Sequence, residues 1–176
     1  MTTLYLARHG ETVDNVARIM QGQRQGQLTS AGRNQMERLA DTLCSVVFDA
    51  VVSSDLWRAY TSAQIVAARF ALTVRTTELL RERDWGDLTG VHIPDGLSLG
   101  EDGDKSLPDN VEKMGALLCR AACFLDWVRN NYPDKTVFAV GHGDINRAVQ
   151  AVHGGVPASE IPLMPNAGYA VLNLTT

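Results

Sequence analysis

The sequence predicts an α/β fold, a three-layer sandwich in which a mostly parallel central sheet is flanked by helices. Short apolar runs of strand length recur along the chain, and amphipathic stretches of helical period separate them. Parallel strands need long crossover connections, usually helical, so this alternation is typical of a parallel sheet covered on both faces. The chain has 176 residues, no linker-like tract and no internal repeat. One domain spanning residues 1–176 is therefore expected.

The first half of the chain is expected to alternate strands and helices. Its elements are a buried strand at 4–7, a helix capped by Thr29, a strand at 50–52, a helix at about 57–70 and a strand within 72–77. In the first of these helices, apolar residues recur at the spacing i, i+3, i+4, i+7, namely at Met36, Leu39, Ala40 and Leu43.

The second half opens on an irregular stretch. Residues 80–110 contain glycines, prolines and a group of acids, which predicts a surface excursion that is partly mobile. A long helix at about 110–131 follows, with one apolar stripe made of Val111, Met114, Leu118, Ala121, Leu125 and Val128. A buried strand at 136–140, a short helix closed by Gly154-Gly155 and a strand at 168–174 complete the pattern. The last strand is expected either to be an edge that pairs between subunits or to lie inside one sheet.

Charge and hydropathy narrow the classes of partner and location. The net charge of −4 disfavours a nucleic-acid or acidic-membrane surface, although it is compatible with a local basic pocket. No apolar run reaches the roughly 18 residues that a membrane helix needs. The first residues lack the basic and long apolar regions of a signal peptide. The expected location is the cytoplasm, with no nucleic-acid or membrane partner.

The cysteines and histidines indicate neither a disulfide framework nor a metal site. The three cysteines, Cys44, Cys119 and Cys123, form no CxxC motif, and the four histidines show no ligand spacing such as HExxH. Cys119 and Cys123 stand four residues apart in the long predicted helix. They are expected to lie on one helix face as packing residues.

Reactive polar residues follow three of the predicted strands. Arg8 and His9 end the first, Arg58 lies just after the second, and His142 ends the fourth. Because parallel strands end at one edge of a sheet, these four side chains are expected around one crevice. Guanidinium groups match phosphate oxygens, and the helices that begin near Arg58 and Asp144 are expected to aim free N–H groups at the same edge. The predicted ligand is a phosphate group.

The motifs that carry these residues resemble those of a known family. The sequence Arg8-His9-Gly10-Glu11-Thr12, with Asn15 following, is similar to the RHGE(T/S)xxN signature of the histidine phosphatase superfamily, also called phosphoglycerate mutase-like. The resemblance continues through SSDLWRAYTSA, LRERDWGDLTG, AVGHGD and PNAGYAVLNL, so it covers almost the whole chain. It implies the phosphoglycerate mutase-like form of the predicted fold.

The resemblance also implies an enzyme of the histidine acid phosphatase type, a phosphoric monoester hydrolase. Neutral His9 would attack phosphorus and form a phosphohistidine. Arg8, Arg58 and an imidazolium at His142 would hold the phosphoryl oxygens and their developing charge. Glu82 would protonate the leaving oxygen and then deprotonate the attacking water. No metal or other cofactor is expected, because the guanidinium and imidazolium groups supply the positive charge.

Further residues are implied as contacts of the phosphate or the substrate. This implied set consists of Asn15, Gln21, Gly22 and Gly143. Asp144 stands where many relatives have glycine, and it is expected to cap the following helix, because an unpaired acid beside phosphate is unfavourable. Trp57 and Trp85 are expected either to line the mouth of the site or, with more weight, to pack.

Two stretches depart from the family pattern. In the loop GQRQGQLTSAG, Gln25 and Gln27 replace residues that are often Asp and Pro in relatives, which leaves the substrate contacts of this loop open. The excursion at 91–109 is shorter than the insertion of phosphoglycerate mutases proper. An open, acidic lid there would admit water to the phosphoenzyme, which favours a phosphatase over a mutase.

Three functions are therefore weighed, each with a small phosphorylated metabolite as the partner. The favoured one is a metal-independent phosphomonoesterase that hydrolyses small phosphate esters. The alternatives are a phosphoglycerate mutase-type phosphotransferase and a catalytically idle protein that binds a phosphorylated ligand. The intact set of Arg8, His9, Arg58, Glu82 and His142 argues against the idle protein. The physiological substrate stays open, as does the choice between monomer and homodimer.

Overall fold

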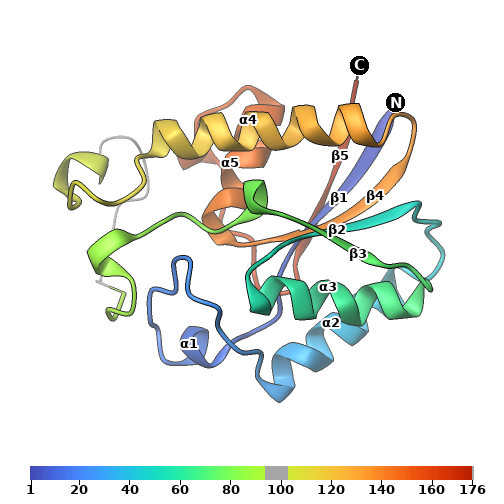
Figure 1. Cartoon of the computed structure of the whole chain (residues 1–176), viewed down its shortest axis with the longest axis horizontal. Helices are drawn as coiled ribbons and strands as arrows, with labels where there is room; N and C mark the ends of the chain where they lie inside the picture. Colours follow the sequence, from blue (N-terminus) through green and yellow to red (C-terminus); the bar gives the residue numbers. More distant parts are fainter. Residues whose placement is uncertain (94–102, 176) are drawn as a thin grey trace.

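The computed structural model describes residues 1–93 and 103–175, and Figure 1 shows the arrangement of its elements. The strands are β1 (Thr2–Arg8), β2 (Ala50–Ser54), β3 (Val74–Thr77), β4 (Thr136–Gly141) and β5 (Tyr169–Leu174). The helices are α1 (Val13–Val16), α2 (Ser30–Thr42), α3 (Trp57–Arg69), α4 (Met114–Asn131) and α5 (Gly143–Gly154). Short 3₁₀ turns occur at Glu78–Leu80, Gly86–Leu88, Gly103–Ser106 and Ala158–Glu160.

The five strands form one sheet in the order β3-β2-β4-β1-β5. The pairs β2–β3, β2–β4 and β1–β4 are parallel, whereas β1 and β5 are antiparallel. The predicted fold class is therefore confirmed, and the last strand is an edge strand of this sheet. Helices α4 and α5 cover one face and α2 and α3 the other, with the two termini close together at the β1–β5 end (Figure 1).

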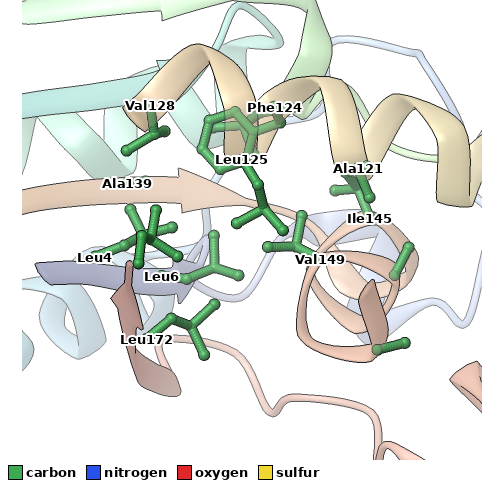
Figure 2. Packing of buried hydrophobic residues seen from close by; sticks show 14 of the residues in the cluster. Leu4, Leu6, Ala121, Phe124, Leu125, Val128, Ala139, Ile145, Val149 and Leu172 are labelled. Atoms are coloured by element: carbon green, nitrogen blue, oxygen red, sulfur yellow. The ribbon is translucent and has the colours of Figure 1, made fainter. Parts of the chain in front are cut away.

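Each face of the sheet carries its own apolar core. On the α4–α5 face, Leu4 and Leu6 of β1 pack with Phe124 and Leu125 of α4 and with Ile145 of α5 (Figure 2). On the opposite face, side chains of α2 and α3 pack against the strands; this second core includes Met36, Leu39, Ala59, Val66, Phe138 and Val140. Burial of the inner strands β2 and β4 on both faces is consistent with their mainly apolar sequences, whereas the edge strands β3 and β5 are partly exposed.

Helix α4 begins at Met114, four residues later than expected. Val111 does not belong to the helical stripe but packs in a separate small cluster with Met20 and Trp85. The residue before the helix, Lys113, makes no side-chain capping bond. Instead, Asp104 accepts the N–H of Met114 from ten residues upstream. The start of the helix is thus fixed by a long-range contact that the local pattern does not contain.

The expected surface excursion is partly anchored. The side chain of Arg83 is fully buried, pairs with Asp104, donates from Nε to the carbonyl of Glu112 and lies 4.6 Å from the centre of the Trp85 ring. Residues 94–102, which are the central part of the expected lid at 91–109, lie outside the described residues. In the described part, Asp104 is a structural partner and not a free charge of a lid.

Cys119 and Cys123 lie on one face of α4, as expected, but the expectation that they pack is wrong. Cys44, Cys119 and Cys123 are all exposed. Along α4 the buried positions are Met114, Leu117, Ala121, Phe124, Leu125 and Val128. Cys119 and Cys123 each follow a buried position by two residues, which places them about 200° around the helix from it, on the solvent side.

Among the described residues, no helix combines the length and apolar character required to cross a membrane.

Candidate active site

A cavity of about 170 Å³ opens where β1 and the starts of α3 and α5 meet. Its lining residues are Arg8, His9, Asn15, Ile19, Met20, Gln21, Gly22, Arg58, Glu82, Trp85, Ile93, Gly143, Asp144 and Leu163. All the predicted site residues except His142 are in this set. His142 is fully buried behind the lining, with its ring centre 5.1 Å from that of His9. We call Arg8, His9, Arg58 and His142 the cradle.

The sheet topology explains how the cradle forms. Arg8 is the last residue of β1, and it pairs in register with Gly141 at the end of the parallel strand β4. His9 and His142 are the residues that follow these two strand ends. Arg58 enters from the first turn of α3, after the neighbouring strand β2. The four side chains meet because adjacent parallel strands end at one edge.

His9 is arranged as a neutral imidazole with one free nitrogen. Its Nδ1 lies 2.7 Å from the carbonyl oxygen of Gly10, which only accepts, so Nδ1 carries the proton and Nε2 has the lone pair. Complete burial, followed by the charges of Arg58 and Arg8, holds the pKa of His9 well below its usual value. The ring is thus unprotonated at Nε2 at neutral pH, as a nucleophile requires.

His142 has the opposite tautomer. Arg58 Nε donates to His142 Nδ1 at 3.1 Å, so the ring proton is on Nε2, which has no partner among the described residues. Burial, and then the Arg58 charge, keep the pKa of His142 well below its usual value. The structure therefore contradicts the expected imidazolium. His142 is a neutral N–H donor, because the adjacent guanidinium opposes a second positive charge.

The two guanidinium groups are fixed by backbone carbonyls. Arg58 donates to Gly22 O at 2.7 Å and also to Arg24 O, and Arg8 donates to Met164 O at 2.7 Å. Burial lowers the pKa of Arg58 to about 10, so the group remains a cation at neutral pH. Arg8 Nε is buried and has no partner among the described residues. These contacts orient both cations before any ligand binds, which reduces reorganisation on binding.

The start of α5 is occupied by Glu82, contrary to the expectation of free N–H groups. Glu82 Oε1 accepts the N–H of Arg83 at 2.9 Å, of Asp144 at 3.1 Å and of Ile145 at 3.2 Å. Oε2 has a single long contact, 3.4 Å to the N–H of Asp144. The carboxylate is thus positioned by one oxygen while the other stays available on the cavity side.

The start of α3 is also occupied. Gln25 Oε1 accepts the N–H of Trp57 at 2.9 Å, and the Gln25 carbonyl accepts the N–H of Arg58 at 3.2 Å. Gln25, one of the departures from the family pattern, therefore caps a helix and does not line the cavity. At both helix starts, N–H groups are accepted by residues of distant loops, through the side chain of Glu82 and through the side chain and carbonyl of Gln25, and local sequence gives no signal of this.

The expectation that Asp144 caps α5 is wrong. The N-cap residue is His142, and its side chain makes no capping bond. Asp144 lines the cavity and is 5% exposed, with Arg147 Nη1 at 3.9 Å from its carboxyl group. Burial, and then the negative charge of Glu82, raise the pKa of Asp144 to about 7. Its position directly after Gly143 was the available sequence signal for a place in the site.

Backbone and side-chain contacts hold the rest of the polar lining. Asn15 closes a capping box with Thr12 at the start of α1, and its Oδ1 accepts from Asn166 Nδ2 at 3.1 Å. Asn166 also donates to the His9 carbonyl at 3.1 Å. Arg120 of α4 donates to the Glu82 carbonyl at 3.3 Å. Sequence reasoning missed Asn166, although it lies in the quoted stretch PNAGYAVLNL, and it missed Arg120, which lies within a long helix and outside the quoted motifs.

An apolar wall completes the cavity. We call it the entrance wall, and it consists of Ile19, Met20, Trp85, Ile93 and Leu163. Trp85 is 5% exposed and Leu163 is 45% exposed, so the wall extends from the interior to the surface. Trp57, in contrast, is 50% exposed and is not in the lining, so the preference for packing is wrong for this residue. The wall comes entirely from loops and turns, where periodicity gives no information.

Known proteins match this chain along most of its length. A family model described as the histidine phosphatase superfamily (branch 1) matches residues 4–176. The uncharacterized phosphatase PhoE of Bacillus subtilis is 30% identical over 172 residues, covering 95% of this chain and 86% of the relative. A glucosyl-3-phosphoglycerate phosphatase of Mycobacterium tuberculosis is 32% identical over 182 residues, covering 95% and 82%. The solved structure of Bacillus stearothermophilus YhfR matches with a TM-score of 0.89 at 28% identity, covering 99% of this chain and 92% of that chain.

Proposed function

Because the chain belongs to the histidine phosphatase superfamily, we propose that it is a phosphomonoesterase that hydrolyses small phosphate esters through a phosphohistidine on His9. The observation that carries this proposal is the state of His9. Its ring is neutral, its Nε2 is unprotonated, and it lines a cavity together with two oriented guanidinium groups. That combination suits in-line attack on a phosphoryl group.

In the first step, the Nε2 lone pair of His9 forms the N–P bond while the P–O bond to the leaving group breaks. Glu82, protonated on Oε2, gives its proton to the leaving oxygen, so the product is a neutral alcohol. The contacts of Oε1 with three backbone N–H groups fix the direction of this transfer. The proposal therefore assigns the proton to the oxygen that the backbone leaves available.

In the second step, water attacks the phosphohistidine. The Glu82 carboxylate takes a proton from the water as the new P–O bond forms and the N–P bond breaks. His9 returns to the neutral tautomer that Gly10 stabilises, and inorganic phosphate leaves. The same carboxyl group thus acts first as an acid and then as a base.

The cradle stabilises the negative charge on the phosphoryl oxygens. Arg8 and Arg58 supply positive charge, and His142 Nε2 supplies a neutral N–H donor that has no other partner among the described residues. Positioning and charge stabilisation account for most of the catalysis in phosphoryl transfer. Since two guanidinium groups provide that charge, the proposed reaction needs no metal ion.

The test is phosphate release in the presence of EDTA from p-nitrophenyl phosphate, phosphoglycerates, sugar phosphates and nucleotides. We expect release by the wild type, none by His9→Ala, and a phosphoryl adduct on His9 by intact mass after an alkaline quench, because the P–N bond of phosphohistidine survives alkali and is hydrolysed in acid. Conversion of 3-phosphoglycerate to its isomer with little free phosphate would instead establish a mutase. Neither turnover nor adduct in a folded protein would indicate a protein that only binds a phosphorylated ligand.

A further inference from the structure

The part of the cavity beyond the cradle is apolar. The entrance wall approaches the cradle at Leu163: a Cβ placed on Gly143 would lie 3.0 Å from Leu163 Cδ1, 3.5 Å from Glu82 Oε2 and 3.7 Å from Arg8 Cζ. Leu163 is therefore close to the group that protonates the leaving oxygen in the proposed reaction. A leaving group bound in line with His9 would contact this wall, and an apolar one would lose unfavourable contact with water there.

Among the described residues, the lining of this part of the cavity offers no further cation to a second anion. Arg8 and Arg58 are the cationic side chains in the described lining, and both have phosphoryl roles in the proposed reaction. Arg24 belongs to the same loop as Gln21 and Gly22, which line the cavity, but Arg24 itself is exposed and is not in the lining. A carboxylate on the substrate would thus lose water without gaining a positive partner.

Two acids make such a carboxylate still less favourable. Glu82 and Asp144 both line the cavity, and Arg147 Nη1 lies 3.9 Å from the Asp144 carboxyl group. Asp144 is almost completely buried, so water screens its charge poorly once the pH exceeds its pKa of about 7 and the carboxyl group is ionised. The phosphoryl group is compensated by the cradle, but a second negative charge on the substrate would face these acids.

We propose that this site selects phosphomonoesters whose leaving group is apolar and uncharged, and that Leu163 and Asp144 are residues that determine this specificity. The proposal rests on the proposed function, since it assigns a substrate class to the same site. Leu163 acts by contact with an apolar leaving group. Asp144 acts by repulsion of an anionic one.

The experiment compares three alkyl phosphates that differ in the leaving group. n-Butyl phosphate is apolar, glycerol 3-phosphate is polar but uncharged, and 3-phosphoglycerate carries a carboxylate. We expect kcat/KM to fall in that order, with a difference of about 10–200-fold between the first and the last. Glycerol 3-phosphate separates the effect of polarity from the effect of charge.

The variant Leu163→Lys places a cation on the exposed part of the wall. It should raise kcat/KM for 3-phosphoglycerate and lower it for n-butyl phosphate. The ratio of kcat/KM for n-butyl phosphate to that for 3-phosphoglycerate should therefore fall to about one or below. Val171→Lys is the matched control, because Val171 is also 45% exposed but lies on β5, outside the lining. Its ratio should equal that of the wild type. The nearly isosteric Asp144→Asn should also raise the relative rate with 3-phosphoglycerate at pH 8, where the wild-type carboxyl group is ionised.

The outcomes separate this proposal from the proposed function. Equal kcat/KM for all three substrates, or a preference for 3-phosphoglycerate, would overturn the specificity proposal and leave the phosphatase intact. The same shift in Leu163→Lys and Val171→Lys would also overturn it. If none of the three substrates releases phosphate and His9 is never phosphorylated, the proposed function itself fails.

Discussion

The two sides of the cavity are built in different ways. The cradle consists of buried polar side chains at the ends of strands and in the first turn of a helix, each fixed by a hydrogen bond to backbone or to another member. The entrance wall consists of apolar side chains from loops, one of which is nearly half exposed. A rigid, polar side suits chemistry, and a loop-built, apolar side suits selection of the leaving group.

This difference predicts how substitutions should divide. Changes in the cradle should reduce turnover of every phosphate ester, because each ester presents the same phosphoryl group. Changes in the entrance wall should alter the ranking of substrates while the chemical step persists. Glu82 and Asp144 lie between the two sides. Both line the cavity, and the backbone N–H of Asp144 helps to orient the Glu82 carboxylate. Variants at these positions should show mixed behaviour.

The largest effect is expected from His9→Ala. Without the nucleophile no phosphohistidine forms, and kcat should fall by at least about 10⁴-fold for all substrates. Steady-state phosphate release measures the loss. His153→Ala is a suitable control, because His153 is exposed near the end of α5 and is not in the lining. Activity of His9→Ala within tenfold of the wild type would mean that another group attacks phosphorus.

Glu82→Gln should separate substrates by leaving group. Without a proton donor, esters of alkyl alcohols should lose about 10²–10⁴-fold in kcat, whereas p-nitrophenyl phosphate, whose leaving group needs little protonation, should lose far less. The glutamine keeps an oxygen that accepts the N–H groups at the start of α5. Equal losses for aryl and alkyl esters would count against Glu82 as the acid.

Arg58→Lys should lower kcat/KM by about 10²–10³-fold for aryl and alkyl esters alike. An ammonium group cannot reproduce the fork that contacts Gly22 O, Arg24 O and His142 Nδ1 together. His142 would also lose the hydrogen bond from Arg58 Nε that determines its tautomer. Arg69→Lys, at the exposed end of the same helix, is the control. A loss confined to one class of ester would place Arg58 on the selective side of the cavity.

The cradle could be predicted from sequence because topology determines it. Once parallel strands are inferred, the residues after 7, 52 and 140 must reach one edge, and Arg8, His9, Arg58 and His142 follow from that. The protonation of His142 could not be predicted in this way. It depends on the contact with Arg58 Nε, and contacts between side chains 84 positions apart are not encoded in periodicity.

The entrance wall and the helix starts could not be predicted for a related reason. Gln25 and Glu82 occupy N–H groups of helices that begin far from them in sequence, and Leu163 reaches the cavity from the irregular stretch before β5. Loop conformation places all three. Asp144 was misassigned because a local rule, acid at a helix start, was applied where burial and Glu82 decide its role.

The smallest effect concerns stability, and it tests the position of Asp144 between the two sides. Its carboxyl group is near Glu82 and faces the cationic side chains of Arg8, Arg83 and Arg147. Burial and Glu82 outweigh these cations and raise its pKa from 3.8 to about 7 in the folded protein. Between those two values the folded state keeps a proton that the unfolded state has lost. Raising the pH across this window therefore lowers the free energy of unfolding.

Asp144→Asn removes this titration. Relative to the wild type, the variant should gain roughly 2–4 kcal/mol in the free energy of unfolding between pH 4 and pH 8, because each unit of pKa shift corresponds to about 1.4 kcal/mol. Urea unfolding at pH 4, 6 and 8 measures the difference. Asp126→Asn, at an exposed position of α4, should follow the wild type at every pH. Parallel curves for Asp144→Asn and the wild type would show that Asp144 is ionised at neutral pH, and its repulsion of anionic leaving groups would then be constant across this range instead of increasing with pH.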